Sequence, residues 1–235
     1  MTILVLAALA LLAGPAHAEE NECRRSPSLA SGAPPTFGRI TAPGRTAFVK
    51  DGLARAGCPD PSPACRERAY LVTADPVILG ERLGAYVCAR YRGAGDDTGW
   101  TGWVPAKSVA VAPAATISPA DWLGTWTGPE ARIRVAQGDK PGMLAFAGDA
   151  TWGAGDPERV RRGGVHIGAF AGTVAPQGAA ASFAVGENGA LPVETGDAAD
   201  CKVWMRRVGP WLVVDDNLAC GGLNVSFRGL YRRQP

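Results

Sequence analysis

The sequence predicts an all-β protein: a small β-barrel followed by a second antiparallel β-barrel or sandwich, stapled by disulfides. Short segments in which apolar and polar residues alternate recur along most of the chain, as in strands with one buried face. The 31 glycines and 19 prolines supply turns between such segments. In addition, no window of about eleven residues or more shows a persuasive helical period.

Residues 1–18, "MTILVLAALALLAGPAHA", have the layout of a secretory signal peptide. An apolar run is followed by Gly14 and Pro15 and then by the small-x-small triplet that ends at Ala18, although no Lys or Arg precedes the run. We therefore expect cleavage after Ala18. The run is shorter than the ~20 apolar residues that cross a bilayer, and no later stretch approaches that length. These features predict a periplasmic or secreted protein with no membrane span.

Export makes the six cysteines interpretable as disulfides in an oxidising compartment. Six cysteines allow about fifteen pairings, so the sequence does not settle the connectivity. The alternative is a metal site, but no C-x-x-C pair exists and cleavage leaves His166 as the only histidine. We expect no metal and no cofactor. The pairing with the best local support joins Cys201 to Cys220 and Cys58 to Cys65, and leaves Cys23 with Cys88.

Net charge and the position of a proline-rich stretch indicate the class of protein and where its domains divide. Lys and Arg number 24 against 22 Asp and Glu, so there is no basic field of the kind that binds nucleic acid. The Pro/Ala/Thr stretch "VAPAATISPADW" from Val111 to Trp122 interrupts the strand pattern and predicts a domain boundary. We expect a mobile lead-in at residues 19–36, a first domain at 37–112 and a second at 118–235.

The first domain resembles a bacterial SH3 domain from Phe37 to Val111. The resemblance rests on "AYLVTADPVILG", "YVCARYRG" and "TGWVPAKSV", and its most specific piece is the segment from Gly102 to Pro105. It implies a small SH3-like barrel that binds cell-wall material or peptides. Two departures are an insertion that carries Cys58 and Cys65, and Ser108 in place of the ligand-contacting tyrosine of eukaryotic SH3 domains. We therefore do not expect polyproline recognition.

Two tryptophans in "DDTGWTGWVPAKSV" lie three places apart on a predicted strand, so they should face opposite sides. Val104 occupies the family's apolar position, which places Trp100 on the inner side and turns Trp103 outward. An outward indole is either a stacking surface for a sugar or peptide or a cover for a core edge. Trp103, Tyr91 and Tyr70 are the candidate ligand-binding residues.

The second domain alternates more clearly, and its segments predict seven or eight antiparallel strands. They are "DWLGTWTG", "ARIRVA", "GMLAFAGDATW", "GVHIGAFAGTV", "AASFAVGE", "CKVWMRR", "PWLVVDDN" and "LNVSFRGLYRR". The first of these resembles the Gly-x-Trp start of lipocalin-like (calycin) barrels. The ending "GLYRR" would then supply an arginine to cover that tryptophan by cation-π contact.

No constellation of residues is specific for catalysis, and we expect the protein not to be an enzyme. His166 alternates outward on its strand with no nucleophile motif beside it. Asp215 and Asp216 are adjacent in a predicted turn, where aspartates usually accept backbone N–H groups, and too few other oxygen ligands are visible for calcium.

The leading hypothesis is an exported binding protein that recognises cell-wall material or an envelope protein, including as an inhibitor of a wall-degrading enzyme such as lysozyme. One alternative is a carrier of a small apolar ligand, with space left by small inward residues at Ala145, Ala147, Ala169 and Ala171. The other alternative is a hydrolase that uses His166 and the aspartates.

Overall fold

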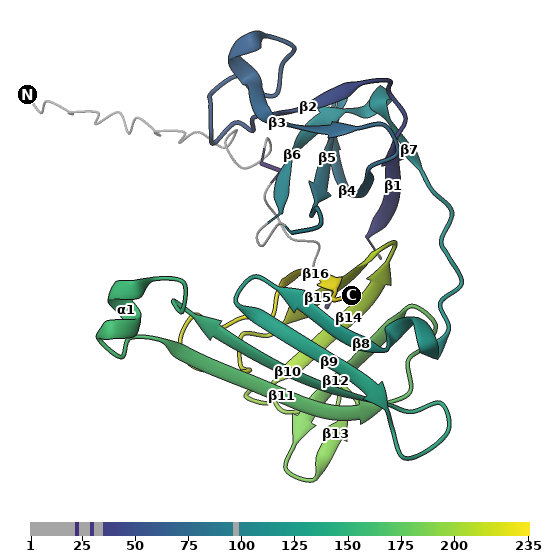
Figure 1. Cartoon of the computed structure of the whole chain (residues 1–235), viewed down its shortest axis with the longest axis vertical. Coiled ribbons are helices and arrows are strands. Elements are labelled where there is room, and N and C mark those ends of the chain that lie inside the picture. The colour runs from purple at the N-terminus through teal and green to yellow at the C-terminus, as the bar shows by residue number, and fades with distance from the viewer. Residues whose placement is uncertain (1–21, 24–28, 31–34, 96–98) are drawn as a thin grey trace, which may run out of the picture.

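The computed structural model describes residues 22–23, 29–30, 35–95 and 99–235 (Figure 1). The expected signal peptide, its cleavage site and most of the expected lead-in lie outside these residues. Two antiparallel sheets make up the described chain, as the sequence predicts. The first sheet ends at Val111 and the second begins at Gly124; between them, residues 112–118 form no helix or strand.

The first domain is a seven-stranded sheet in the order β3-β2-β6-β5-β4-β1-β7. The segment "RAYLVTADPVILGE" forms two strands and the segment "TGWTGWVPAKSVAV" forms two more, while β1 was not expected. Its strands are β1 (Thr36–Ile40), β2 (Arg45–Val49), β3 (Arg66–Val72), β4 (Pro76–Leu83), β5 (Tyr86–Tyr91), β6 (Trp100–Pro105) and β7 (Val109–Val111). Two short 3-10 helices, η1 (Pro63–Cys65) and η2 (Ala106–Ser108), precede β3 and β7.

Both sides of the β5–β6 hairpin are covered. On the inner side, Phe48, Val87 and Val104 belong to the barrel core. On the outer side, Trp103 packs with Val49 and with the disulfides Cys23–Cys88 and Cys58–Cys65. A short domain with few apolar residues thus protects a second apolar surface with covalent links rather than with another layer of strands.

The expected sides of the two tryptophans are correct, but their expected exposures are wrong. Trp100 lies on the side of Val104 and its ring centre is 6.2 Å from that of Phe48, yet it is 43% exposed. Trp103 points outward from the barrel but is only 1% exposed. Strand parity determines the side, whereas the disulfide-linked segments that cover Trp103 come from elsewhere in the chain.

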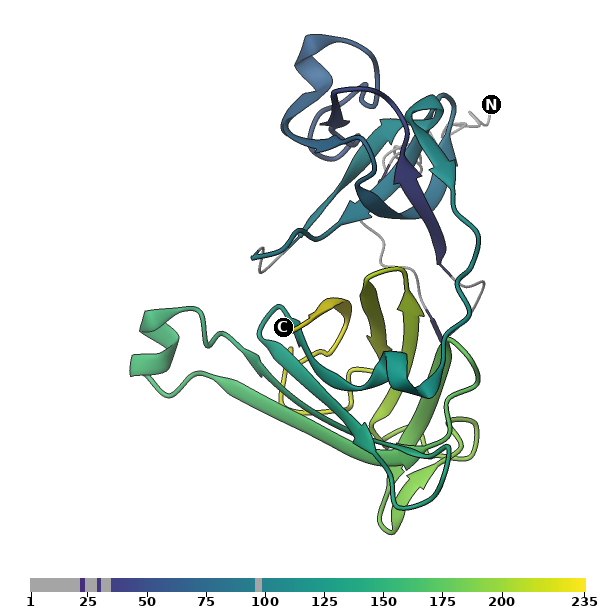
Figure 2. The same ribbon diagram turned by 45° about the vertical axis from the view of Figure 1, so that its right-hand side comes forward.

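The second domain is a nine-stranded sheet in the order β11-β10-β9-β8-β16-β15-β14-β12-β13, one strand more than expected. It curls into a nearly closed barrel, with β11 along its rim (Figures 1 and 2). Its strands are β8 (Gly124–Gly128), β9 (Ala131–Gln137), β10 (Leu144–Trp152), β11 (His166–Val174), β12 (Ala180–Gly186), β13 (Gly189–Leu191), β14 (Lys202–Val208), β15 (Trp211–Asp216) and β16 (Gly229–Arg233). The helices η3 (Pro119–Trp122) and α1 (Pro157–Arg161) lie before β8 and between β10 and β11.

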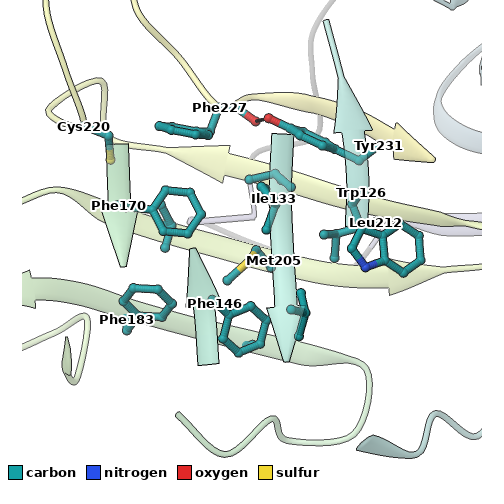
Figure 3. Close-up of a cluster of buried hydrophobic side chains, with 14 of the residues drawn as sticks. Trp126, Ile133, Phe146, Phe170, Phe183, Met205, Leu212, Cys220, Phe227 and Tyr231 are labelled. Atoms are coloured by element: carbon teal, nitrogen blue, oxygen red, sulfur yellow. Dashed lines mark hydrogen bonds between the residues drawn. The ribbon is translucent and has the colours of Figure 1, made fainter. Parts of the chain in front are cut away.

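Aromatic side chains fill the inside of this barrel (Figure 3). Phe146, Phe170, Phe183 and Phe227 are each at most 4% exposed and contact one another edge-on or tilted. The expectation of small inward residues is wrong, because the register places alanines on the outer face: Ala147, Ala169 and Ala171 are exposed and Ala145 is half-buried. Aromatic rings rather than small side chains therefore line the interior, which removes the sequence feature that favoured the carrier hypothesis.

The expected strand "LNVSFRGLYRR" begins only at Gly229. The carboxylate of Asp216 accepts hydrogen bonds from the backbone N of Phe227 at 2.6 Å and from Ser226 Oγ at 3.1 Å. Asn224 adopts a left-handed conformation with φ of 66°. A side chain that satisfies the backbone in this way competes with strand pairing, so residues 217–228 form a loop.

The arginine that covers Trp126 comes from a different strand than expected. The guanidinium of Arg207 on β14, not one from "GLYRR", lies 4.2 Å from the centre of the Trp126 ring. Burial lowers the pKa of Arg207 to about 10, which leaves it charged at neutral pH.

One arginine joins the two domains. Arg92 follows β5, is 3% exposed, and donates from Nη1 to the carbonyl oxygens of Thr127 at 2.5 Å and Leu230 at 2.6 Å. Its own carbonyl oxygen accepts from Trp211 Nε1 at 3.1 Å and from Arg232 Nη1 at 2.7 Å. This reciprocal set of bonds attaches the end of β5 to β15, β16 and the end of β8.

We predict that Trp103→Ala destabilises the protein more than Trp100→Ala. Removal of the buried indole should lower the free energy of unfolding by about 3 to 5 kcal/mol. Removal of the half-exposed one should cost about 1 kcal/mol. Urea denaturation of the two variants beside the parent checks this, and equal losses would mean that the cover over Trp103 is not a tight one.

We predict that Arg92→Met separates the unfolding of the two domains. Two buried carbonyl oxygens would lose a charged donor, which should cost about 2 to 4 kcal/mol. Calorimetry should then show two transitions in place of one cooperative transition. Arg68→Met, which removes an exposed arginine of β3 at the edge of the first sheet, is the control and should leave the transition unchanged.

Candidate functional site

A groove of about 740 Å³ crosses the outer face of the first domain, and we call it the first-domain groove. Its floor is the outer side of β2 from Arg45 to Val49. One wall is the loop Asp60–Ser62 together with Arg66 at the start of β3. The other wall is formed by Ala85 and Tyr86 and by residues 105–108, the end of β6 with η2.

Local bonds fix the loop wall. The disulfide Cys58–Cys65 closes a separation of 7 residues. Asp60 Oδ1 accepts from the backbone N of Ser62 at 2.7 Å. The end of the loop is held to the residue that follows β2, because the backbone N of Lys50 donates to the carbonyl oxygen of Cys65 at 2.8 Å. A wall tied at both ends loses little conformational entropy when a ligand binds.

The groove carries more positive than negative charge. Arg45, Arg66 and Lys107 border it, and no salt bridge joins any of them to another described residue. The carboxyl group of Asp60 is the single acid in its lining; hydrogen bonds from the side chain and backbone of Ser62 lower its pKa, so it stays ionised. Three cations against one hydrogen-bonded carboxylate favour ligands with acidic groups.

Tyr86 contributes an aromatic ring and a hydroxyl to the wall. Partial burial, followed by the nearby charge of Asp60, raises the pKa of its phenol above the usual value, so the hydroxyl stays a hydrogen-bond donor. It lies opposite Pro105 in the β5–β6 register. The groove therefore combines a ring with cations, as peptide and sugar sites often do.

None of the three ligand-binding residues predicted from the sequence lines this groove. Trp103 is buried beneath the disulfides, so a ligand has no access to its ring. Tyr91 lies at the junction of the domains, with its ring centre 6.4 Å from that of Trp211. Tyr70 is exposed outside the groove, where its ring contacts the Arg45 guanidinium at 4.3 Å and helps to position it.

A second groove, of about 1020 Å³, lies on the second domain between the β8–β9 turn and the neighbouring ends of β10 and β11. Glu130 shapes it from a left-handed conformation with φ of 46°. Its carboxylate accepts from the backbone N of Gly153 at 2.8 Å and of Gly155 at 2.9 Å. The carboxylate of Glu130 is thus already bound to backbone groups of the protein. No aromatic ring lines this groove.

His166 and the paired aspartates have structural partners. His166 shares the inner side of β11 with Phe170, so the expectation that it points outward is wrong; its ring lies 5.3 Å from that of Trp152 and its Nδ1 bonds the carbonyl oxygen of Leu223. Asp215 and Asp216 lie on β15 rather than in a turn, and both are buried. Asp215 pairs with Arg228 at 2.5 Å.

Comparison with protein-family models, curated proteins and solved structures finds no match to this chain. Within the described residues, no three His, Cys, Asp or Glu side chains are placed to share a metal ion. No helix in that part of the chain is long and apolar enough to cross a membrane.

We predict that the double substitution Cys58→Ser and Cys65→Ser loosens the groove wall. Loss of this short closed loop should lower the free energy of unfolding by about 2 to 3 kcal/mol. Hydrogen exchange at the amides of Ser62 and Cys65 should accelerate, while the amides of β10 serve as the internal control. Unchanged exchange at Ser62 would mean that its bond to Asp60 suffices without the disulfide.

Proposed function

We propose that this chain is an exported, non-catalytic binding protein whose first-domain groove holds cell-wall material. The observation that carries the proposal is the groove itself, a preformed concave site with both walls tied to the domain. Its volume of about 740 Å³ falls within the ~300–1,000 Å³ of typical ligand sites. It is large enough for a few residues of a peptide or sugar chain.

The chemistry of the groove suits wall polymers, which join sugar chains to short peptides with free carboxyl groups. The ring of Tyr86 and the neighbouring prolines offer flat apolar surface for a sugar or a peptide backbone. Arg66 and Lys107 offer charged donors for carboxylates. Arg45 is held over Tyr70 and so is partly ordered before a ligand arrives.

Two features of the sequence support the same function. The segment from Gly102 to Pro105 resembles bacterial SH3 domains, which commonly bind cell-wall material or peptides. Three disulfides and no free cysteine in the described chain fit an oxidising compartment, as the leader-like residues 1–18 do.

We predict that Tyr86→Ala weakens binding to purified peptidoglycan at least about tenfold, because the substitution removes a ring worth ~1.4 kcal/mol or more of contact. Co-sedimentation with sacculi measures this. Tyr70→Ala is the matched control, since it removes an exposed tyrosine outside the groove, and it should bind at most a fewfold more weakly through the freed Arg45.

Three results would contradict the proposal. The first is that the parent protein does not co-sediment with sacculi. The second is that Tyr86→Ala and Tyr70→Ala bind like the parent. The third is that the protein inhibits lysozyme on a soluble substrate without binding sacculi, which would make a wall-degrading enzyme the partner instead.

A further inference from the structure

A pocket of about 400 Å³ lies where the two domains meet, and we call it the junction pocket. Both domains contribute to its lining. The first domain supplies Arg39 of β1, Pro76 of β4, Tyr91 of β5 and Ala94, and the second supplies Gly209 and Pro210 of the β14–β15 turn and Arg232 of β16. A pocket of this volume holds a small ligand, since typical ligand sites measure ~300–1,000 Å³.

The turn that forms one side of the pocket is fixed by packing. Gly209 has a φ of 54°, and a Cβ added to it would lie 2.4 Å from the ring of Phe37. Only glycine accepts both this conformation and this close approach. The Phe37 ring in turn contacts the ring of Trp211 edge-on. The pocket is therefore shaped before a ligand arrives, which lowers the entropic cost of binding.

Each of the two arginines is held by one of its nitrogens. Arg39 Nη1 donates to the carbonyl oxygen of Ala74 at 3.1 Å, and its guanidinium carbon lies 5.4 Å from the centre of the Phe37 ring. Arg232 Nη1 donates to the carbonyl oxygen of Arg92 at 2.7 Å. The Nε and Nη2 atoms of both arginines make no hydrogen bond to another described residue. Both guanidinium groups are thus positioned and still have donors for a ligand.

The charge of the pocket is not balanced by the described part of the chain. Two arginines line it together with no acidic residue. No salt bridge joins either arginine to a described acid. The described acid that adjoins the lining in the sequence, Asp75, accepts from the backbone N of Val72 at 2.7 Å and so has a partner within its own turn. Two like charges that share a pocket repel each other, and a bound anion would remove that cost.

We propose that the junction pocket binds a phosphate group between Arg39 of the first domain and Arg232 of the second. Guanidinium groups match the oxygens of phosphate in geometry and charge. A phosphate monoester carries about −1.5 to −2 charges near neutral pH, which matches two cations. Its tetrahedral oxygens accept from donors on different sides, whereas a single carboxylate offers its oxygens in one plane. The ring of Tyr91 supplies apolar surface for the rest of the phosphorylated molecule.

This site is separate from the first-domain groove, with which it shares no lining residue. Phosphate binding at the junction and wall binding at the groove are therefore independent properties, and each can fail without the other.

Calorimetric titration of the mature protein with phenyl phosphate tests the proposal, with benzoate as the carboxylate that carries the same ring. The parent should bind phenyl phosphate with a Kd of about 1 mM or tighter, and benzoate at least about tenfold more weakly. Arg39→Gln and Arg232→Gln should each weaken phenyl phosphate binding at least about tenfold. Arg39→Gln is the decisive variant, because Arg39 is exposed and its one hydrogen bond is to a backbone carbonyl of its own domain.

Arg68→Gln and Arg134→Gln are the matched controls. Each removes one exposed arginine outside the pocket, from β3 and β9 respectively, and should bind phenyl phosphate like the parent. Three results would overturn the proposal: no binding by the parent up to about 10 mM, equal losses in the controls and in Arg39→Gln, or benzoate binding as tight as that of phenyl phosphate.

Discussion

The arrangement of the two domains depends on a buried arginine that uses backbone carbonyl groups as acceptors. Arg92 is in contact with the second domain where β8 and β16 lie side by side, and the indole of Trp211 returns a hydrogen bond to its carbonyl oxygen. A guanidinium removed from water must find acceptors in fixed directions. The hydrogen bonds of this one residue of the first domain therefore fix the positions of the ends of three strands of the second domain, β8, β15 and β16.

Apolar contacts complete the same junction. Phe37 and Tyr91 of the first domain both meet the Trp211 ring edge-on, with ring centres 6.4 Å away in each case. Edge-on aromatic contacts are directional, so they favour one orientation of the domains. Since the first-domain groove lies on the outer face of β2, away from this junction, a ligand could enter without parting the domains.

The sequence predicts the pattern of strands well because alternation is a local property. The all-β class, the positions of most strands and the sides of Trp100 and Trp103 all follow from a period of two residues. The three disulfides in the structure are the pairs favoured from the sequence. What alternation does not report is which face is covered, and Trp103 and the outer alanines are misassigned for this reason.

Sequence reasoning also misses features made by distant side chains. The carboxylate of Asp216 accepts hydrogen bonds from the backbone N of Phe227 and from the hydroxyl of Ser226, and so prevents a strand that the pattern favours. The first-domain groove joins four segments separated in the chain, and Tyr86 gives no local signal of its place in the wall. The insertion with Cys58 and Cys65 was the one available hint, because a stapled, proline-rich loop marks a rigid border.

The nested arrangement of two disulfides has a consequence for how the chain matures. Cys23 bonds Cys88 across a separation of 65 residues, and the Cys58–Cys65 pair lies inside that interval. A chain that enters an oxidising compartment with its amino terminus first presents Cys58 and Cys65 to Cys23 before Cys88 arrives. Closure of a short loop costs less entropy than closure of a long one, so Cys58 and Cys65 combine early with each other. Formation of the Cys58–Cys65 disulfide removes both competing thiols, so Cys23 stays reduced until Cys88 is available to bond it.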